Sequence, residues 1–306
     1  MNKICCPVCK SNHTVKNGKR NGIQLYKCAD CGYQFRRNHL PSNQLIWSKY
    51  LNEKQTVNEL AATYKTSVST VKRRLSDVSI QWTQPSLSGG GFVHIDATYW
   101  GRNNGMLIAI DSQSSRVLYL SFIKHEKIAD YEDAIISIKE RGYDIRGIII
   151  DGIKSLFSVF SSYKLQMCHF HMMQIVKRYI TQNPRMLAAK ELKHLILKLP
   201  NTTKVSFELE YTNWKEKFKD VINKRSELKN GKSRFRHRRL RSAIHSIDFY
   251  LPYLFTYQEG DCQGMPNTNN KLEGVFTDLK KNLNNHSGMR EENRKRFICG
   301  FFLAWK

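Results

Sequence analysis

FVHID (residues 92–96) and GIIID (residues 147–151) are apolar runs of strand length, and each ends in an aspartate. Continuous apolar runs of this length predict buried β-strands, so Asp96 and Asp151 are expected at strand ends. A single aspartate in such a position usually forms a turn. Two of them a few ångströms apart would repel each other, and a divalent cation between them is the usual solution.

The segments around these runs alternate between strand and helix patterns. Strand-length apolar runs lie at residues 92–100, 106–111, 116–123 and 165–170, and helical spacing lies at residues 130–141 and 156–160. The predicted order is β-β-β-α-β-α-β, which is that of the ribonuclease H-like α/β fold with its mixed sheet. In this topology the first and fourth strands are neighbours, so we expect Asp96 and Asp151 to meet at the centre of the sheet.

A third acid lies far downstream in NTNNKLE (residues 267–273). Asn267 or Thr268 can cap a helix that starts here, which puts Glu273 in its early turns and completes the order β-β-β-α-β-α-β-α. Three carboxylates suit two Mg²⁺ (or Mn²⁺) ions about 3.5–4 Å apart, an arrangement that serves phosphoryl transfer. We therefore expect Glu273 to join the two aspartates as a catalytic metal ligand.

Three other acids compete for these roles. Asp111 ends a strand before a serine-rich turn, at the opposite edge from Asp96 if the strands are antiparallel, so we interpret it as a turn former. Glu259 and Asp261 lie in QEGDC (residues 258–262), a predicted loop, and rank below the downstream glutamate.

The composition predicts a globular protein of two or three domains, because 41% of its 306 residues are hydrophobic and 25% are charged. No apolar stretch has membrane-spanning length and the start lacks the layout of a signal peptide, so we expect a cytoplasmic protein. The net charge of +24 is concentrated in residues 1–90 and 177–241, while the segments with the three acids are nearly neutral. Basic regions of this kind are expected to neutralise phosphates, which predicts double-stranded DNA as a partner and association with the nucleoid.

The most basic run is KSRFRHRRLR (residues 232–241), in which arginines alternate with an aromatic residue. A solvated surface is the simpler interpretation, but the pattern favours contact with nucleic acid. The candidate DNA-binding residues of this run are Arg234, Arg236, Arg238, Arg239 and Arg241. Trp214 in the same basic block could stack on a displaced base, although an aromatic residue at helical spacing more often belongs to a core.

CPVC (residues 6–9) and CADC (residues 28–31) form two C-x2-C pairs separated by 18 residues. This spacing is typical of a zinc ribbon, and residues 18–27 between the pairs predict a short hairpin. The four expected Zn²⁺ ligands are Cys6, Cys9, Cys28 and Cys31. Cys5 is the spare thiol, and a disulfide or redox role is the weaker interpretation in a reducing compartment.

The stretch that begins with residues 42–51 has the pattern of a three-helix DNA-binding unit. Thr56 and Glu59 make a capping-box pattern for the second helix, and Ser67 is a suitable N-cap for the third. The third helix is expected to bury three apolar residues, Val68, Val71 and Leu75. Its other face offers five side chains to a major groove in helix-turn-helix fashion, namely Ser69, Thr70, Lys72, Arg73 and Arg74. A small helical bundle with a charged face is the alternative, and PSLSGGG (residues 85–91) predicts a flexible linker after it.

Four motifs carry a resemblance to a known family. They are HIDATY (residues 94–99), IDG (residues 150–152), CHFH (residues 168–171) and NTNNKLEG (residues 267–274). Together they resemble the motif set of the Mutator-like DDE transposases of bacterial insertion sequences, over roughly residues 92–300. The resemblance implies that the metal-binding trio is Asp96, Asp151 and Glu273.

The same resemblance implies a C-x-x-H motif near the site, formed by Cys168 and His171. By itself this spacing suggests zinc, but no second pair of ligands is apparent, and a buried cysteine beside a hydrogen-bonded histidine is the alternative. The resemblance also implies that residues 175–265 are an all-helical insertion, and helix-spaced apolar residues in that block agree with it.

The predicted domains are a zinc ribbon at residues 1–38, a helix-turn-helix domain at 39–84, a ribonuclease H-like catalytic domain at 85–174 and 266–306, and a helical insertion domain at 175–265. The predicted function is a DNA transposase that binds the terminal inverted repeats of an insertion sequence and catalyses metal-dependent strand cleavage and strand transfer. Because two ends must be brought together, a homodimer is expected. The alternatives are a sequence-specific DNA-binding regulator with an inactive core and a ribonuclease H-like nuclease that cuts without joining.

Overall fold

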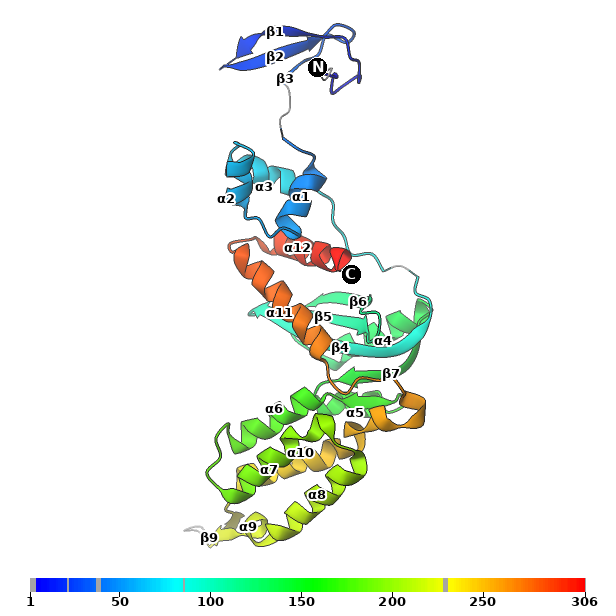
Figure 1. Ribbon diagram of the computed structural model, residues 1–306, viewed down its shortest axis with the longest axis vertical. Helices are drawn as coiled ribbons and strands as arrows, with labels where there is room; N and C mark the ends of the chain where they lie inside the picture. Colours follow the sequence, from blue (N-terminus) through cyan, green and yellow to red (C-terminus); the bar gives the residue numbers. More distant parts are fainter. Residues whose placement is uncertain (1–3, 21, 37–39, 85, 228–230, 306) are drawn as a thin grey trace. The chain divides into compact units, whose positions relative to one another are not determined.

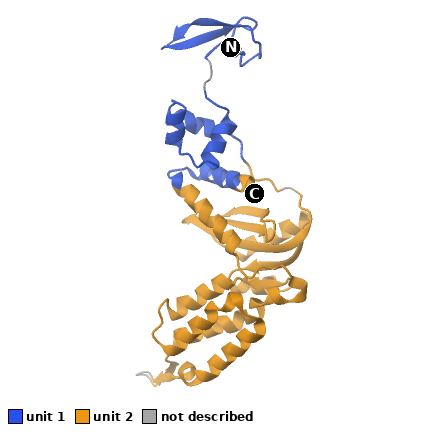
Figure 2. Ribbon diagram, viewed as in Figure 1, with its two compact units in different colours: residues 1–80, 285–301 blue, residues 81–284, 302–306 orange. Residues whose placement is uncertain are grey.

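The computed structural model describes residues 4–20, 22–36, 40–84, 86–227 and 231–305, and shows a mixed α/β structure with a five-stranded mixed sheet (Figure 1). The chain divides into two compact units (Figure 2): residues 1–80 with 285–301, and residues 81–284 with 302–306. This division differs from the predicted assignment of residues 266–306 to a single domain with the sheet. No described helix has both the length and the apolar character needed to cross a membrane.

The sheet of the second unit is built from two kinds of strand pairing. Its elements in chain order are β4 (Gly90–Gly101), β5 (Asn104–Asp111), β6 (Val117–Ile123), α4 (Ile128–Glu140), β7 (Asp144–Ile150), α5 (Lys154–Val159) and β8 (Leu165–Met167). The first three strands form an antiparallel meander, and β7 and β8 then add in parallel on the other side of β4, giving the spatial order β6-β5-β4-β7-β8. The order of elements along the chain is the predicted one.

The two central strands are apolar on both faces, as strands covered on both sides must be. Val93 and Ile95 of β4 belong to the large core cluster of this unit. Phe92 lies on the opposite face and packs with Ile149 of β7 in a smaller cluster. Asp96 follows Phe92 by four residues, so it lies on this second face.

β4 begins earlier than predicted, because Gly90 and Gly91 are strand residues. A β-carbon at Gly90 would lie 2.6 Å from the carbonyl oxygen of Asp144, so a side chain there would obstruct the approach of β4 to β7. Leu87 is buried, and its backbone N–H is hydrogen-bonded to the residue that follows α4. The predicted flexible linker is therefore wrong for these three residues, and Pro85, its first residue, lies outside the described part of the chain.

The block between β8 and the last two helices is helical except for one hairpin. Its elements are α6 (His169–Ile180), α7 (Leu187–Leu197), α8 (Lys204–Lys217), α9 (Lys219–Asn223), β9 (Arg225–Glu227), β10 (Ser233–Phe235) and α10 (Arg238–Leu254), with short 3-10 turns at Leu199–Asn201, Thr256–Gln258 and Gly260–Cys262. The prediction of an all-helical insertion is thus wrong at β9 and β10, whose three-residue strands are too short and polar to show an alternating pattern. Buried side chains of this block and of the sheet form one continuous apolar cluster.

Two helices follow this block, α11 (Asn270–Asn285) and α12 (Glu291–Ala304). Because α11 begins at Asn270, neither Asn267 nor Thr268 immediately precedes it, and the predicted capping residues are wrong. Glu273 lies in the first turn of α11, as predicted. The helix buries Leu272 and Leu279 along one side.

The first unit contains a small sheet and the predicted three helices. The strands are β1 (Thr14–Arg20), β2 (Ile23–Cys28) and β3 (Gln34–Arg36), and the helices are α1 (Asn43–Leu51), α2 (Val57–Thr63) and α3 (Val68–Ser76). The capping box of Thr56 with Glu59 and the N-cap at Ser67 are confirmed. Val71 and Leu75 are buried as predicted, but Val68 is 37% exposed because it occupies the first position of its helix.

Part of α12 packs on these three helices, which the sequence pattern does not predict. The guanidinium group of Arg296 donates to the carbonyl oxygens of Leu75 at 2.9 Å and Ser76 at 3.2 Å, and so satisfies the end of α3. Gly300 faces Trp47 so closely that a β-carbon would lie 2.8 Å from the indole ring. Residues 291–301 therefore act as a fourth helix of this small bundle.

We expect His286 to make the stability of this bundle depend on pH. Its ring is buried, with the ring centroids of Tyr50 at 4.1 Å and Phe297 at 5.0 Å. Burial lowers the pKa of His286 below its ordinary value of 6.5, and the carboxylate of Glu59 only partly offsets this effect. A depressed folded-state pKa means that stability is fully present above the unfolded pKa and is lost as the pH falls through the folded one.

We therefore expect amide hydrogen exchange in α1 and α12, corrected for intrinsic rates, to be faster at about pH 5 than at about pH 7.5. The variant His286→Phe should lose this difference, because an apolar ring takes up no proton. If the variant keeps the same pH dependence, another group is responsible.

Candidate functional site

Asp96 and Asp151 lie side by side on one face of the sheet. The parallel pairing of β4 with β7 sets His94 opposite Ile149; Asp96 lies two residues further along β4, and Asp151 directly follows the last residue of β7. Neighbouring strands are about 4.8 Å apart, and residues two apart on a strand share a face. Asp96 is only 6% exposed, and the side chain of Asp151 is 20% exposed. The strand register thus brings together the two acids singled out in the sequence.

The charged form of Asp96 is unfavourable at this position. Burial and the neighbouring charge of Asp151 raise the pKa of Asp96 well above its usual range, and Glu273 contributes in the same direction. The backbone N–H of Ala97 donates a hydrogen bond to Oδ1 of Asp96 at 2.7 Å, which opposes the rise. A cation bound here would restore the charged form, because opposite charge lowers a carboxyl pKa.

The start of α11 is attached to the end of β8, and this attachment brings Glu273 to the sheet. The backbone N–H of His169 donates to the carbonyl oxygen of Asn267 at 2.9 Å. The backbone N–H of Asn269 donates to the thiol sulfur of Cys168 at 3.2 Å. The two ends of the long insertion therefore lie next to each other, at the end of β8.

His171 lies between two of the three acids. Its Nδ1 is 2.7 Å from Oδ1 of Asp151, and its Nε2 is 3.4 Å from Oε1 of Glu273. Burial acts against a charged ring, but the interactions with Asp151 and Cys168 outweigh it and raise the pKa of His171 to about 11. In the absence of a metal ion the raised pKa favours the protonated imidazole, whose charge offsets part of the negative charge of the acids. The C-x-x-H pair thus touches the acidic site directly.

The residues at this site fit a metal ion. Ligand atoms of Asp151, Cys168 and His171 lie within 4.8 Å of one another. Oδ1 of Asp151 and Nδ1 of His171 lie 2.7 Å from each other, and both atoms are of metal-ligand type.

The donor set is mixed in its preference for metals. Carboxylate oxygens suit hard cations such as Mg²⁺, whereas a thiolate and an imidazole suit Zn²⁺. Among the described residues, the three carboxylates of Asp96, Asp151 and Glu273 do not by themselves form a group within 4.8 Å. The compact donor group is the one that contains Cys168 and His171.

Two further side chains at this site carried no role in the sequence analysis. His94 and Asn269 are 1% and 0% exposed, and their side-chain nitrogen and oxygen atoms lack hydrogen-bond partners of acceptable geometry in the described structure. Burial, followed by the charge of Lys271, lowers the pKa of His94 to about 4, so its ring is neutral. Both residues belong to the motifs around Asp96 and Glu273, but nothing in their spacing distinguishes them from core residues.

The turn after Asp151 is held by residues that lie far away in the sequence. The hydroxyl group of Tyr250 in α10 donates to the carbonyl oxygen of Gly152 at 2.5 Å. A β-carbon at Gly152 would meet the end of the Ile175 side chain in α6, so a larger residue here would require that side chain to shift. The glycine of the IDG motif therefore allows the helical block to pack against the end of β7. Tyr250 gave no signal in the sequence, because a tyrosine in an apolar helix face is ordinary.

The rival acids have other partners. Oδ1 of Asp111 accepts hydrogen bonds from the backbone N–H groups of Gln113 at 3.1 Å and Ser114 at 2.6 Å, and Tyr143 donates to its Oδ2. The interpretation of Asp111 as a turn former is confirmed.

Glu259 and Asp261 both face one lysine. The ammonium group of Lys164 lies 2.6 Å from a carboxylate oxygen of Glu259 and 3.1 Å from one of Asp261. Together with Cys262 the two acids form a group of metal-ligand type, but the lysine already supplies a positive charge there.

The four cysteines of the two C-x2-C pairs converge, so they can bind zinc. The sulfur of Cys6 is 3.6 Å from that of Cys31, the sulfur of Cys9 is 3.5 Å from that of Cys28, and all four lie within 4.8 Å of one another. Cys5 is outside the cluster, and its thiol donates to Oδ1 of Asn12 at 2.7 Å. Its interpretation as the spare thiol agrees with this geometry.

The predicted DNA-reading face of α3 is only partly free. Arg74 donates to the carbonyl oxygen of Pro41 at 3.2 Å and to Oδ1 of Asn43 at 2.8 Å, so it fixes the segment before α1. The hydroxyl group of Thr70 is 2.9 Å from that of Ser67. The exposed members of the predicted set are Ser69, Lys72 and Arg73.

Two of the five arginines in the basic run have structural contacts. Arg239 donates to the carbonyl oxygens of Tyr179 at 2.9 Å and Arg178 at 2.5 Å, both in the last turn of α6. The guanidinium carbon of Arg241 lies 3.6 Å from the ring centroid of Phe235, and its side chain also donates to Oδ1 of Asn223. These contacts account for both side chains without DNA.

Trp214 belongs to the core of the helical block. It is 4% exposed, its indole N–H donates to the carbonyl oxygen of Ala188 at 3.1 Å, and its ring stacks on Tyr211 with centroids 6.0 Å apart. The interpretation as a core residue is confirmed, and stacking on a displaced base would require this packing to open.

A scan against protein-family models and a search among curated proteins found no match.

Proposed function

We propose that this protein is a DNA transposase with a ribonuclease H-like catalytic core. The observation that carries the proposal is the meeting of Asp96 and Asp151 on neighbouring strands, with Glu273 joined to Asp151 through the ring of His171. Three acids close to one another in a basic chain suit the charge stabilisation that phosphoryl transfer on DNA requires.

The strand order supports the ribonuclease H-like assignment. Three antiparallel strands continue into two parallel ones, and β4, which carries Asp96, pairs with β7, which ends one residue before Asp151. A likeness of fold does not by itself give a function, so the three acids carry the proposal.

The proposed roles divide among the residues of the site. Asp96, Asp151 and Glu273 would hold Mg²⁺ or Mn²⁺, which supplies electrostatic stabilisation for phosphoryl transfer when bound. His171 positions Asp151 and Glu273, because its protonated ring attracts both carboxylates in the absence of another cation. Water attacks the phosphate at the end of the element first, and the freed 3′-hydroxyl then attacks a phosphate of the target, so no nucleophilic side chain is needed.

The distribution of charge supports DNA as the partner. Residues 177–241 contain 19 Lys and Arg against 6 Asp and Glu, whereas residues 91–176, which include both aspartates, contain 9 of each. Lys72 and Arg73 add exposed positive charge on α3 in the first unit. The proposal assigns recognition of the terminal repeats to the zinc ribbon and to α3, with two copies of the chain needed to hold two ends.

A strand-transfer assay tests this proposal. A pre-cut duplex that carries the end of the element, incubated with the protein, Mg²⁺ and a target plasmid, should give a joined product. The matched control is the same duplex with a 3′-dideoxy end, which should give none because it lacks the attacking hydroxyl. Cutting without joining would identify a nuclease instead, and binding without either reaction would identify a DNA-binding regulator.

A further inference from the structure

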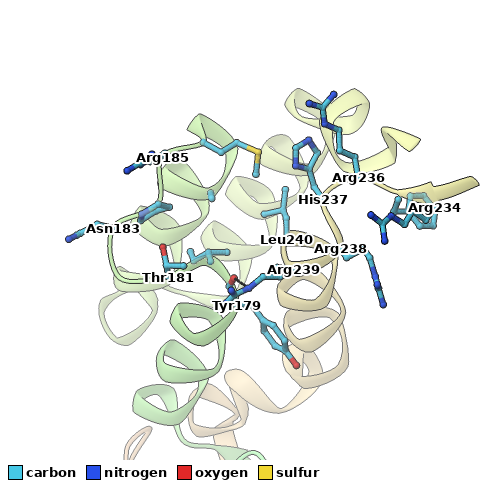
Figure 3. A pocket seen from close by; sticks show the side chains of 15 residues that line it. Tyr179, Thr181, Asn183, Arg185, Arg234, Arg236, His237, Arg238, Arg239 and Leu240 are labelled. Atoms are coloured by element: carbon cyan, nitrogen blue, oxygen red, sulfur yellow. Dashed lines mark hydrogen bonds between the residues drawn. The ribbon is translucent and has the colours of Figure 1, made fainter. Parts of the chain in front are cut away.

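A basic cavity opens at the end of the helical block, far in sequence from the three acids. It has a volume of about 580 Å³ and lies between the end of α6, the start of α7 and the chain from β10 into α10. Figure 3 shows arginine side chains from two separate segments around it, Arg185 on one side and Arg234, Arg236 and Arg238 on the other. No carboxylate is among its described lining residues.

The arginines of this cavity fall into two groups. Arg239 is used within the fold, since it donates to two carbonyl oxygens at the end of α6. Arg185, Arg234, Arg236 and Arg238 are exposed, and within the described structure their guanidinium groups form no hydrogen bond or ion pair. Four unpaired like charges around one cavity repel one another, and an anion is the partner that removes this cost.

Two helix starts add to the positive potential of the same cavity. The residue before α7 is Met186 and the residue before α10 is His237, and neither caps its helix with a side-chain hydrogen bond. Both residues line the cavity. Free backbone N–H groups at a helix start attract anions, so the two helices reinforce the four guanidinium groups.

We propose that this cavity binds phosphodiester groups of the DNA backbone, independently of base sequence. Guanidinium groups match phosphate oxygens in pairs, whereas contacts to phosphate carry no direct information on sequence. DNA is favoured over a small anion because the four groups are exposed around an open cavity larger than one phosphate, in a segment with 19 Lys and Arg against 6 acids. The inference rests on the proposed function for the identity of the anion, and it assigns Arg185, outside the basic run, to the same contact.

Salt-dependent binding to a fluorescent duplex of arbitrary sequence tests the inference. The double variant Arg185→Gln with Arg236→Gln should reduce the slope of log K against log salt by about 2, since each neutralised phosphate contributes about 0.9. The loss of affinity should be the same on a second, unrelated duplex. The matched control is Lys204→Gln with Lys219→Gln, two exposed lysines of the same block outside the cavity lining, and its slope should be that of the unaltered protein.

The outcomes separate this inference from the proposed function. If the unaltered protein binds DNA and the cavity variant keeps its slope, or the control loses as much, the cavity assignment is wrong while the transposase proposal stands. If the unaltered protein binds no DNA, both are wrong. A titration with inorganic phosphate tests whether the cavity binds a small anion instead. If the unaltered protein binds phosphate, the cavity variant does not, and the salt slope on DNA is the same for both, the assignment to DNA is wrong.

Discussion

Replacement of Asp96 by Asn should abolish metal-dependent cleavage of element-end DNA, with a rate loss of about 10³-fold or more, while DNA binding stays unchanged. The loss follows because a metal ligand provides several kcal/mol of charge stabilisation and each 1.36 kcal/mol is a factor of ten in rate. Binding should persist because Asp96 is 6% exposed and carries the wrong charge for a phosphate contact. Cleavage of a labelled duplex and its Kd, measured on the same preparation, check both parts.

The same substitution should leave the folded protein as stable as before, or more stable. The pKa of Asp96 is raised by burial and by the charge of Asp151, so its ionised form opposes folding in the absence of a cation. Asn has nearly the same shape and no charge, which removes that cost. A residue selected for stability would show the opposite behaviour, so thermal unfolding without metal separates a functional from a structural role.

Asp111→Asn is the matched control for this experiment. Asp111 also ends a strand of the same sheet and is 8% exposed, but it accepts hydrogen bonds from Gln113, Ser114 and Tyr143. Its loss should cost about 1–3 kcal/mol of stability and leave the chemical step intact at a temperature where the variant is folded. Metal-dependent cleavage by Asp96→Asn at the original rate would remove the acids from the proposed mechanism.

The central sheet could be predicted from the sequence because its strands are long and apolar. β4, β5 and β7 are continuous buried runs, and the topology they form makes Asp96 and Asp151 neighbours without any knowledge of side-chain contacts. The place of Glu273 was predicted from the Asn-rich motif before it and from the resemblance, since no periodicity reveals that an insertion returns to its starting point. The hydrogen bonds from His169 and Asn269 that close this return involve backbone groups, which all residues share.

Other features were beyond prediction for different physical reasons. The apolar residues of α12 indicate that the helix is buried, but not that Arg296 and Gly300 fit it to the end of α3 and to Trp47. A run of arginines predicts a basic surface. Only the fold separates Arg239, which binds carbonyl oxygens of α6, from Arg236, whose exposed guanidinium group has no hydrogen bond among the described residues. Glycines before a strand have the pattern of a linker, and the sequence does not show that the backbone of Asp144 lies against Gly90.

Removal of zinc should unfold the amino-terminal ribbon and leave the second unit intact. The described part of residues 4–36 buries only two hydrophobic-class side chains, Cys6 and Cys28, so this segment has almost no apolar core of its own. Structural zinc supplies about 10–16 kcal/mol to small domains of this kind, far more than a three-stranded sheet of this size obtains from burial. The variant Cys28→Ser should therefore bind no zinc, and its first 36 residues should become sensitive to protease at a rate well above that of the unaltered protein.

Cys5→Ser is the matched control for the ribbon. It changes the neighbour of Cys6 but removes only a thiol that donates to Asn12, outside the group of four converging sulfurs. This variant should retain one zinc per chain by elemental analysis and the protease resistance of the unaltered protein. Zinc retained by Cys28→Ser would contradict the four-cysteine site. Zinc lost by Cys5→Ser would show that Cys5 is a zinc ligand, contrary to the proposed set. Because the second unit has its own continuous core, amide exchange in β4, β5 and β7 should be the same in both variants, which separates loss of the ribbon from general unfolding.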